Sequence, residues 1–181
     1  PNEYQNAEST LSATPTPAAV TYFVHVSDAH MGTSADYEPA DKSTWERKFK
    51  RNMLKSDDVI HPPIIVDTGD AVTFVDNSSY AIYDNAISHA AMPYLKVPGN
   101  HDYPVSLWLG YGWPRYFSYD LGDVQVIGFD SLHTVDGQYV NMNWLENELR
   151  QNAPNKMIIL ASHYPLAQPD WAAAEWGTSR L

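Results

Sequence analysis

The sequence predicts an α/β protein in which short buried strands alternate with helices. Runs of β-branched, aromatic and aliphatic residues of strand length recur along the chain, and helical patterns with apolar residues three or four apart lie between them. Several of the strand-like runs end in a cluster of polar residues. In folds of this class the carboxyl ends of the strands form the ligand-binding edge. We therefore expect the polar clusters to meet at one edge of a sheet.

The composition allows one domain with a substantial core and limits its chemistry. The chain has 181 residues, 44% of them hydrophobic, and no cysteine. Disulfide frameworks, thiolate zinc sites and cysteine nucleophiles are therefore excluded. The formal net charge of -11 repels phosphate backbones, so duplex nucleic acid is not an expected partner. No apolar run reaches the roughly 20 residues of a membrane span, so none is expected.

The chain divides into a tail and a folded domain. Residues 1–20 are rich in Ser, Thr, Pro and Ala, and they cannot bury enough apolar surface to offset their ordering entropy, which predicts a flexible tail or linker. The folded domain is expected over residues 21–181. Few lysines and many Tyr, Trp, Asn, Ser and Thr residues favour an extracytoplasmic or secreted location, with the cytoplasm as the alternative.

The first two predicted strands each deliver acidic side chains. The strand at 22–26 runs into Asp28 and His30, which point the same way on extended backbone and make a plausible pair of metal ligands. The strand at 64–66 runs into a tight turn from which Asp70 emerges. Asp67, at the start of that turn, is expected to stabilise it, with a supporting contact to a metal ligand as the alternative.

A helix is predicted between these two strands. Ser43-Thr44-Trp45-Glu46 resembles a capping box, and Trp45, Phe49 and Met53 lie on one face. The same helix carries a cluster of Lys and Arg residues. We interpret this cluster as a solvated face, with a phosphate-attracting rim as the alternative.

The third predicted strand, residues 92–97, leads through a Pro-Gly turn to Asn100, His101 and Asp102. These three neighbours present an amide, an imidazole and a carboxylate. Ordinary turn chemistry is the alternative for this stretch taken alone, because Asn and Asp favour turns.

The second half of the chain predicts further elements. A helix near 79–91 precedes the third strand, and an aromatic, Gly-rich stretch at 108–113 follows it; this stretch forms either part of a substrate pocket or a packed loop. Residues 116–129 predict a hairpin with a three-residue turn. His133 is predicted at the surface or at a pocket rim. A helix starting at Asn143 is followed by a strand.

This last predicted strand, residues 156–161, delivers His163, so four strands end in polar clusters. Carboxylate, amide and imidazole ligands without sulfur suit Mn, Fe, Zn, Co or Ni better than calcium. A carboxylate between two ligand clusters can bridge two ions, which lower the pKa of a shared water and hold it in line with a phosphorus atom.

The order and spacing of these clusters resemble the calcineurin-like metallophosphoesterase superfamily, over most of residues 21–165. The matching motifs are Asp28-Ala29-His30, Gly69-Asp70, Gly99-Asn100-His101-Asp102 and His163. The helix around Trp144-Leu145-Glu146 is similar to the branch that contains cyclic-nucleotide phosphodiesterase-like proteins. The resemblance implies a two-sheet α/β/β/α sandwich and a metal-dependent phosphoesterase. Its substrate would be a small phosphomonoester or phosphodiester, hydrolysed by water activated between two divalent transition-metal ions, with Mn, Fe or Zn expected.

The resemblance also implies the metal ligands. Asp28 and His30 would bind the first metal, Asp70 would bridge both ions, and Asn100 and His163 would bind the second.

Two further residues take catalytic roles by the same resemblance. His101 would stabilise developing charge or protonate the leaving oxygen. Asp102 would orient His101, a carboxylate–imidazole pairing with physical sense of its own.

Two departures from the family pattern qualify these expectations. No Gly-His-x-His motif follows His163, and the second sheet is short of strands. We therefore expect a domain that lacks its C-terminal part, with two further His ligands supplied by a missing segment or a partner. The alternative is a non-catalytic surface or assembly module on the same fold. Purple acid phosphatases carry a tyrosine ligand after the Gly-Asp motif, whereas Ala71-Val72-Thr73 follow Asp70 here, which separates the chain from that branch.

Overall fold

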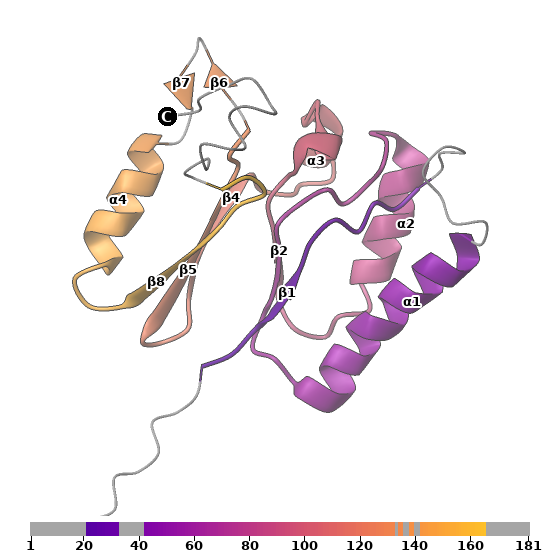
Figure 1. Ribbon diagram of the computed structural model, residues 1–181, viewed down its shortest axis with the longest axis horizontal. Coiled ribbons are helices and arrows are strands. Elements are labelled where there is room, and N and C mark those ends of the chain that lie inside the picture. Colours follow the sequence, from indigo (N-terminus) through magenta and orange to yellow (C-terminus); the bar gives the residue numbers. More distant parts are fainter. Residues whose placement is uncertain (1–20, 33–41, 133, 136–137, 140–141, 166–181) are drawn as a thin grey trace, which may run out of the picture.

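The protein folds in four layers, helix, sheet, sheet and helix, which confirms the predicted two-sheet sandwich (Figure 1). The computed structural model describes residues 21–32, 42–132, 134–135, 138–139 and 142–165. The first sheet and the two helices that cover it are β1 (Val24–Val26), β2 (Ile65–Asp67), β3 (Tyr94–Lys96), α1 (Lys42–Lys55) and α2 (Asn77–Ile87). The second sheet and its helix are β4 (Tyr116–Asp120), β5 (Val124–Phe129), β8 (Met157–Ala161) and α4 (Met142–Asn152).

Several short elements complete the fold. They are a π-helical turn η1 (Ser56–Ile60), a 3-10 turn η2 (Asn100–Asp102), the helix α3 (Ser106–Gly110) and a small ribbon of β6 (Thr134–Val135) and β7 (Gln138–Tyr139). The predicted tail at 1–20 and His133 lie outside the described residues. Among the helices of the described ranges, none is long and apolar enough to cross a membrane.

The first sheet is parallel throughout, in the order β1-β2-β3. Val26 pairs with Asp67, and Asp67 pairs with Lys96, so the three strands end in register. Parallel strands need crossover connections, which α1 and α2 supply. The loops that follow the three strands therefore all leave the same edge of the sheet.

Strand β2 lies at the centre of the protein because it is apolar on both faces. Ile65 faces the cluster formed with α1 and α2, whereas Ile64 and Val66 face the second sheet. An uninterrupted apolar run of this kind is typical of parallel strands covered on both sides. On α1, Phe49 and Met53 pack inward, which leaves the exposed Lys and Arg side chains on the solvent side, as the solvated-face interpretation expects.

The second sheet combines the predicted hairpin with one parallel strand. Strands β4 and β5 pair antiparallel, and β8 pairs parallel with β5 after the α4 crossover. Ile127 and Phe129 on β5 face Leu145 of α4, while Val124 and Val126 face the first sheet. The twofold alternation along β5 thus places one face against each neighbouring layer.

The aromatic stretch at 108–113 packs into the core. Trp108 is fully buried, Trp113 is 8% exposed, and both rings contact Tyr80 of α2. The indole N–H of Trp108 donates to the carbonyl oxygen of Pro114 at 3.0 Å. Of the two alternatives that the sequence left open, the structure favours packing, but residues 108–110 belong to helix α3 and not to a loop.

A buried polar network lies behind the turn that follows β2. The carboxylate of Asp67 accepts from the backbone N–H of Gly69 at 2.9 Å and from the hydroxyls of Tyr83 and Tyr94, each at 2.6 Å. Asp67 thus stabilises the turn, as expected from the sequence. Lys96 is 7% exposed and stands over the ring of Trp113 at 4.4 Å, a cation–π contact. Burial lowers the pKa of Lys96 to about 8.

The turns after β2 and β3 touch through two glycines. Gly69 has φ +101, and a Cβ placed on it would lie 2.3 Å from the backbone nitrogen of Gly99. A Cβ on Gly99 would lie 2.2 Å from a carboxylate oxygen of Asp70. Only glycine at both positions lets the two turns approach this closely.

We predict that Gly69→Ala destabilises the protein far more than Gly122→Ala. Both positions have left-handed φ angles, but a Cβ placed on Gly122, at +81, would meet no atom of the described residues within 4 Å. The control should therefore lose only the backbone term, about 1 kcal/mol. Gly69→Ala adds a clash with backbone and should lose about 3 kcal/mol or more of the free energy of unfolding. Urea unfolding measures both; equal losses would contradict the contact between the turns.

We predict that Lys96 makes the free energy of unfolding increase at alkaline pH. Its pKa is about 8 in the folded protein against 10.5 as the reference value. Between these values the unfolded chain binds more protons than the folded one, so stability increases with pH. Relative to Lys96→Met, the wild-type protein should gain about 2 kcal/mol between pH 7 and pH 10.

Urea unfolding at several pH values measures this difference. Lys55→Met is the matched control, because Lys55 is exposed on α1, and its difference from wild type should stay constant with pH. A constant difference for Lys96→Met as well would show that burial does not favour the neutral amine.

Candidate metal centre

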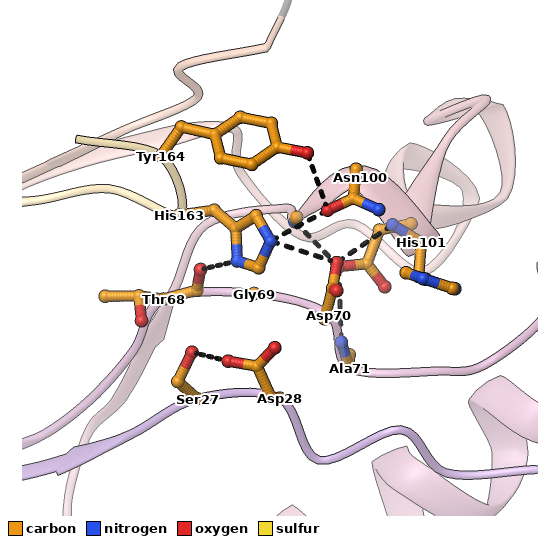
Figure 2. A network of polar contacts seen from close by, with 12 residues as sticks. Ser27, Asp28, Thr68, Gly69, Asp70, Ala71, Asn100, His101, His163 and Tyr164 are labelled. Atoms are coloured by element: carbon orange, nitrogen blue, oxygen red, sulfur yellow. Dashed lines mark hydrogen bonds and ion pairs between the residues drawn. The ribbon is translucent and has the colours of Figure 1, made fainter. Parts of the chain in front are cut away.

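Residues from four strand ends meet at one edge of the sandwich (Figure 2). His30, Asp70 and His101 form one group whose ligand atoms all lie within 4.8 Å of one another. Asp28, Asp70 and His163 form a second group by the same measure. Asn100 adjoins the second group through His163. The structure thus brings together every metal-ligating residue that the sequence predicted.

In the loop after β1, the ligand candidates Asp28 and His30 lie on left-handed backbone and not on the extended backbone that the sequence predicted. Asp28 and His30 have φ angles of 56° and 45°, and Asp70 has 56°. The left-handed region is unfavourable for residues with a side chain and persists where the surroundings impose it, often at functional sites. Here the N–H of Asp28 donates to Gly69 O, and the N–H of His30 donates to Asp70 O, each at 2.9 Å. These bonds tie the loops after β1 and β2 together.

Asp70 is the centre of the arrangement. It is only 3% exposed, and its two oxygens face different neighbours. Oδ2 lies 3.5 Å from Nε2 of His30, and Oδ1 lies 3.4 Å from Nε2 of His163. Oδ1 also accepts from the backbone N–H of His101 at 2.8 Å. One carboxylate therefore reaches both groups.

The lone pairs around His163 suit a cation. Nδ1 lies 3.0 Å from Thr68 O, and because a carbonyl oxygen only accepts, Nδ1 carries the hydrogen. In the neutral ring Nε2 then offers a lone pair. It faces Oδ1 of Asn100 at 2.9 Å and Oδ1 of Asp70 at 3.4 Å. Three electron-rich atoms converge without a hydrogen between them, so these residues fit a divalent metal ion.

His101 is oriented by a backbone carbonyl. Its Nδ1 donates to Thr73 O at 3.0 Å, and its ring meets that of His30 edge-on, with centroids 4.7 Å apart. The backbone partners of His101 and His163, Thr73 and Thr68, were not predicted, because a carbonyl oxygen is present at every residue and leaves no signal in the sequence.

The predicted pairing of Asp102 with His101 is wrong. The carboxylate of Asp102 accepts from the backbone N–H groups of Gly99 at 2.8 Å and Ala71 at 3.2 Å, and from the hydroxyl of Tyr80 at 3.2 Å. Adjacent residues on a 3-10 turn project about 120° apart, so His101 faces the site while Asp102 points into the core. Burial raises the pKa of Asp102 to about 7. The buried carboxyl of Asp102 thus stabilises the Asn100–Asp102 turn through these hydrogen bonds.

Tyr164 is a further residue that could not be singled out from the sequence. Its hydroxyl donates to Oδ1 of Asn100 at 3.1 Å (Figure 2). The available signal was its position directly after His163. An open groove of about 560 Å³ is lined by His163 and, among others, by His25, Ser27 and Ser162.

The chain resembles known phosphoesterases in sequence and in fold. The sequence pattern of the family described as calcineurin-like phosphoesterase matches residues 21–178. The chain is 27% identical over 160 residues to a probable glycerophosphodiester phosphodiesterase GpdQ of Arcobacter nitrofigilis. That alignment covers 78% of this chain and 56% of the relative, so the chain spans a little over half of the relative's length.

Two solved structures share the fold. A dimetal phosphatase from Danio rerio superposes with a TM-score of 0.60 at 10% identity, covering 80% of this chain and 69% of that one. Purple acid phosphatase PPD1 from yellow lupin, Lupinus luteus, superposes with a TM-score of 0.55 at 15% identity, covering 84% and 32%. With the family match over most of the folded domain, these findings lead to one conclusion: the chain belongs to the calcineurin-like phosphoesterase family.

Proposed function

We propose that this protein hydrolyses a small phosphodiester with the help of two divalent metal ions held at the edge described above. The observation that carries the proposal is the position of Asp70, a buried carboxylate whose Oδ2 faces His30 and whose Oδ1 faces His163. Membership of the calcineurin-like phosphoesterase family supports the reaction class.

The proposed ligand sets follow the strand ends. They differ from the two groups of nearby ligand atoms described above, in which Asp28 lies with His163 and His30 lies with His101. Asp28 and His30 hold the first ion, with His30 Nε2 lying 3.7 Å from Oδ1 of Asp28 and 3.5 Å from Oδ2 of Asp70. Asn100 and His163 hold the second, and Asp70 serves both. Ions bound there would supply positive charge for the phosphoryl oxygens and a water whose pKa is lowered toward neutrality. The side chains fix where that charge and water are presented.

His101 is the candidate proton donor. Its Nδ1–H donates to the carbonyl oxygen of Thr73, which orients the ring. Nε2 is then the atom that can pass a proton to the leaving oxygen. The ring nitrogens of His101 also lie close enough to His30 and Asp70 to make a ligand role the competing assignment.

The substrate class rests on two observations. The relative from Arcobacter nitrofigilis bears the name of a glycerophosphodiester phosphodiesterase. The net charge of -11 disfavours a polyanionic partner such as duplex DNA. We therefore propose a phosphodiester of small alcohols as the substrate, with Mn, Fe or Zn as the metal.

We predict that the full-length protein, stripped of metal and supplied with Mn²⁺, hydrolyses bis-p-nitrophenyl phosphate. A chelator should abolish the activity, because without metal ions the site has no positive charge to stabilise the phosphoryl oxygens. Release of p-nitrophenol measures the rate, and p-nitrophenyl phosphate, the monoester, should be the poorer substrate. No hydrolysis of either compound with Mn²⁺, Fe²⁺ or Zn²⁺ would overturn the proposed function.

The two central residues should fail in different ways. Asp70→Asn should lose bound metal and activity together, because one variant removes a ligand of both ions. His101→Ala should keep its metal while kcat falls about 100-fold, the usual contribution of a general acid. Metal content by atomic absorption and kcat measure the two effects.

His89→Ala is the matched control, since His89 follows the C-terminal end of α2 and, among its described contacts, bonds only locally to Asn85 O. It should leave both readouts unchanged. Equal metal loss in Asp70→Asn and His101→Ala would instead assign His101 as a ligand.

A further inference from the structure

We infer that Tyr164 is a positioning residue of the metal centre, which fixes the side-chain amide of Asn100 with its oxygen toward the metal. This inference rests on the proposed function and adds a residue to it. Tyr164 reaches Asn100 from the second sheet, whereas Asn100 follows β3 of the first sheet.

Tyr164 contacts Asn100 through a hydrogen bond to Oδ1, the atom proposed to bind the metal. The hydroxyl of Tyr164 donates to Oδ1 of Asn100 at 3.1 Å, and Nε2 of His163 approaches the same oxygen at 2.9 Å (Figure 2). An amide oxygen has two lone pairs. The O–H of Tyr164 takes one of them, and the other faces the position between His163 and Asp70 where a cation fits.

An asparagine ligand needs this support because its amide has two unlike ends. The carbonyl oxygen of Asn100 can bind a cation, whereas its NH₂ group cannot. Without metal, the lone pair on Nε2 of His163 attracts the NH₂ end instead. With its proton directed at Asn100, the hydroxyl of Tyr164 stabilises the orientation in which Oδ1 is turned toward the site, whereas the flipped amide would require the hydroxyl to reorient and accept from NH₂.

Tyr164 can act as a fixed reference because its own backbone is held elsewhere. Its N–H donates to Oγ of Ser131 at 3.0 Å, and its carbonyl oxygen accepts from Oγ of Ser162 at 2.7 Å. The ring of Tyr164 lies beside that of His163, with centroids 5.1 Å apart. Ser131 follows β5 and Ser162 follows β8, so the second sheet sets the position of the hydroxyl.

Asp130, next to Ser131, ties the same region back to the first sheet. Its carboxylate forms an ion pair with Arg115 at 2.8 Å and accepts from the hydroxyl of Tyr103, which follows the Asn100–Asp102 turn. Two tyrosines thus bridge the sheets in opposite directions. Tyr103 links the Asn100–Asp102 turn to Asp130, and Tyr164 donates to Oδ1 of Asn100 within that turn.

The test is Mn²⁺ binding by metal-free full-length protein, measured by calorimetric titration. Tyr164→Phe keeps the ring and removes only the hydroxyl. Loss of a residue that orients a metal ligand typically weakens binding 10- to 100-fold. We expect a loss of about 10-fold at one of the two sites and no change at the other. Tyr119→Phe, on β4 between the sheets, is the matched control and should bind as the wild type does.

An Asn100→Asp background separates orientation from general support. A carboxylate presents an oxygen whichever way it is rotated, so the hydroxyl has little left to orient. In that background we expect Tyr164→Phe to change Mn²⁺ affinity less than twofold. A loss of about 10-fold in both backgrounds would show that Tyr164 supports the fold and does not orient the amide.

The outcomes distinguish this inference from the function it rests on. If the wild-type protein binds no Mn²⁺, the proposed function and the role of Tyr164 both fail. If the wild type binds two ions and Tyr164→Phe binds both as tightly, only the positioning role is overturned.

Discussion

The buried carboxylate of Asp70 is the group on which the rest of the site depends. A carboxylate at 3% exposure needs partners for its charge, since water no longer supplies them. The N–H of His101 satisfies part of this need, and the carboxylate lone pairs that face Nε2 of His30 and of His163 are available to a cation. The contact between Gly69 and Gly99 brings the N–H of His101 within reach of Asp70, because it lets the turns after β2 and β3 touch. Backbone packing between two glycines therefore determines how Asp70 meets His101.

The two sheets contribute different residues to the site at this edge. The parallel first sheet ends in register and so delivers Asp28, His30, Asp70 and Asn100 together. His163 comes from the second sheet, so its place depends on the packing of one sheet on the other, through Val66 and Val126 among others. The hydrogen bond from His163 to Thr68 O spans this junction, as does that of Tyr164 to Asn100. The site is thus sensitive to any change that shifts the sheets relative to each other.

Much of the fold and of the site could be predicted, because both rest on patterns visible in side chains. The apolar run at 64–66 and the alternation along 124–129 predict buried strands, and polar residues after strands predict the site's edge. The differences have physical causes. Asp102 and His101 are neighbours in sequence, which favours pairing them, yet the 3-10 turn directs them apart. The aromatic stretch at 108–113 could not be assigned, because packing against Tyr80 is a tertiary contact.

The central claim is that Asp70 lies between two metal ions. Anomalous diffraction from crystals of the full-length protein grown with Mn²⁺ tests it most directly. Our account predicts two peaks about 3.5–4 Å apart, the usual spacing of two-metal sites, one on each side of the Asp70 carboxylate. A single peak, no peak, or two peaks that do not share Asp70 would contradict it.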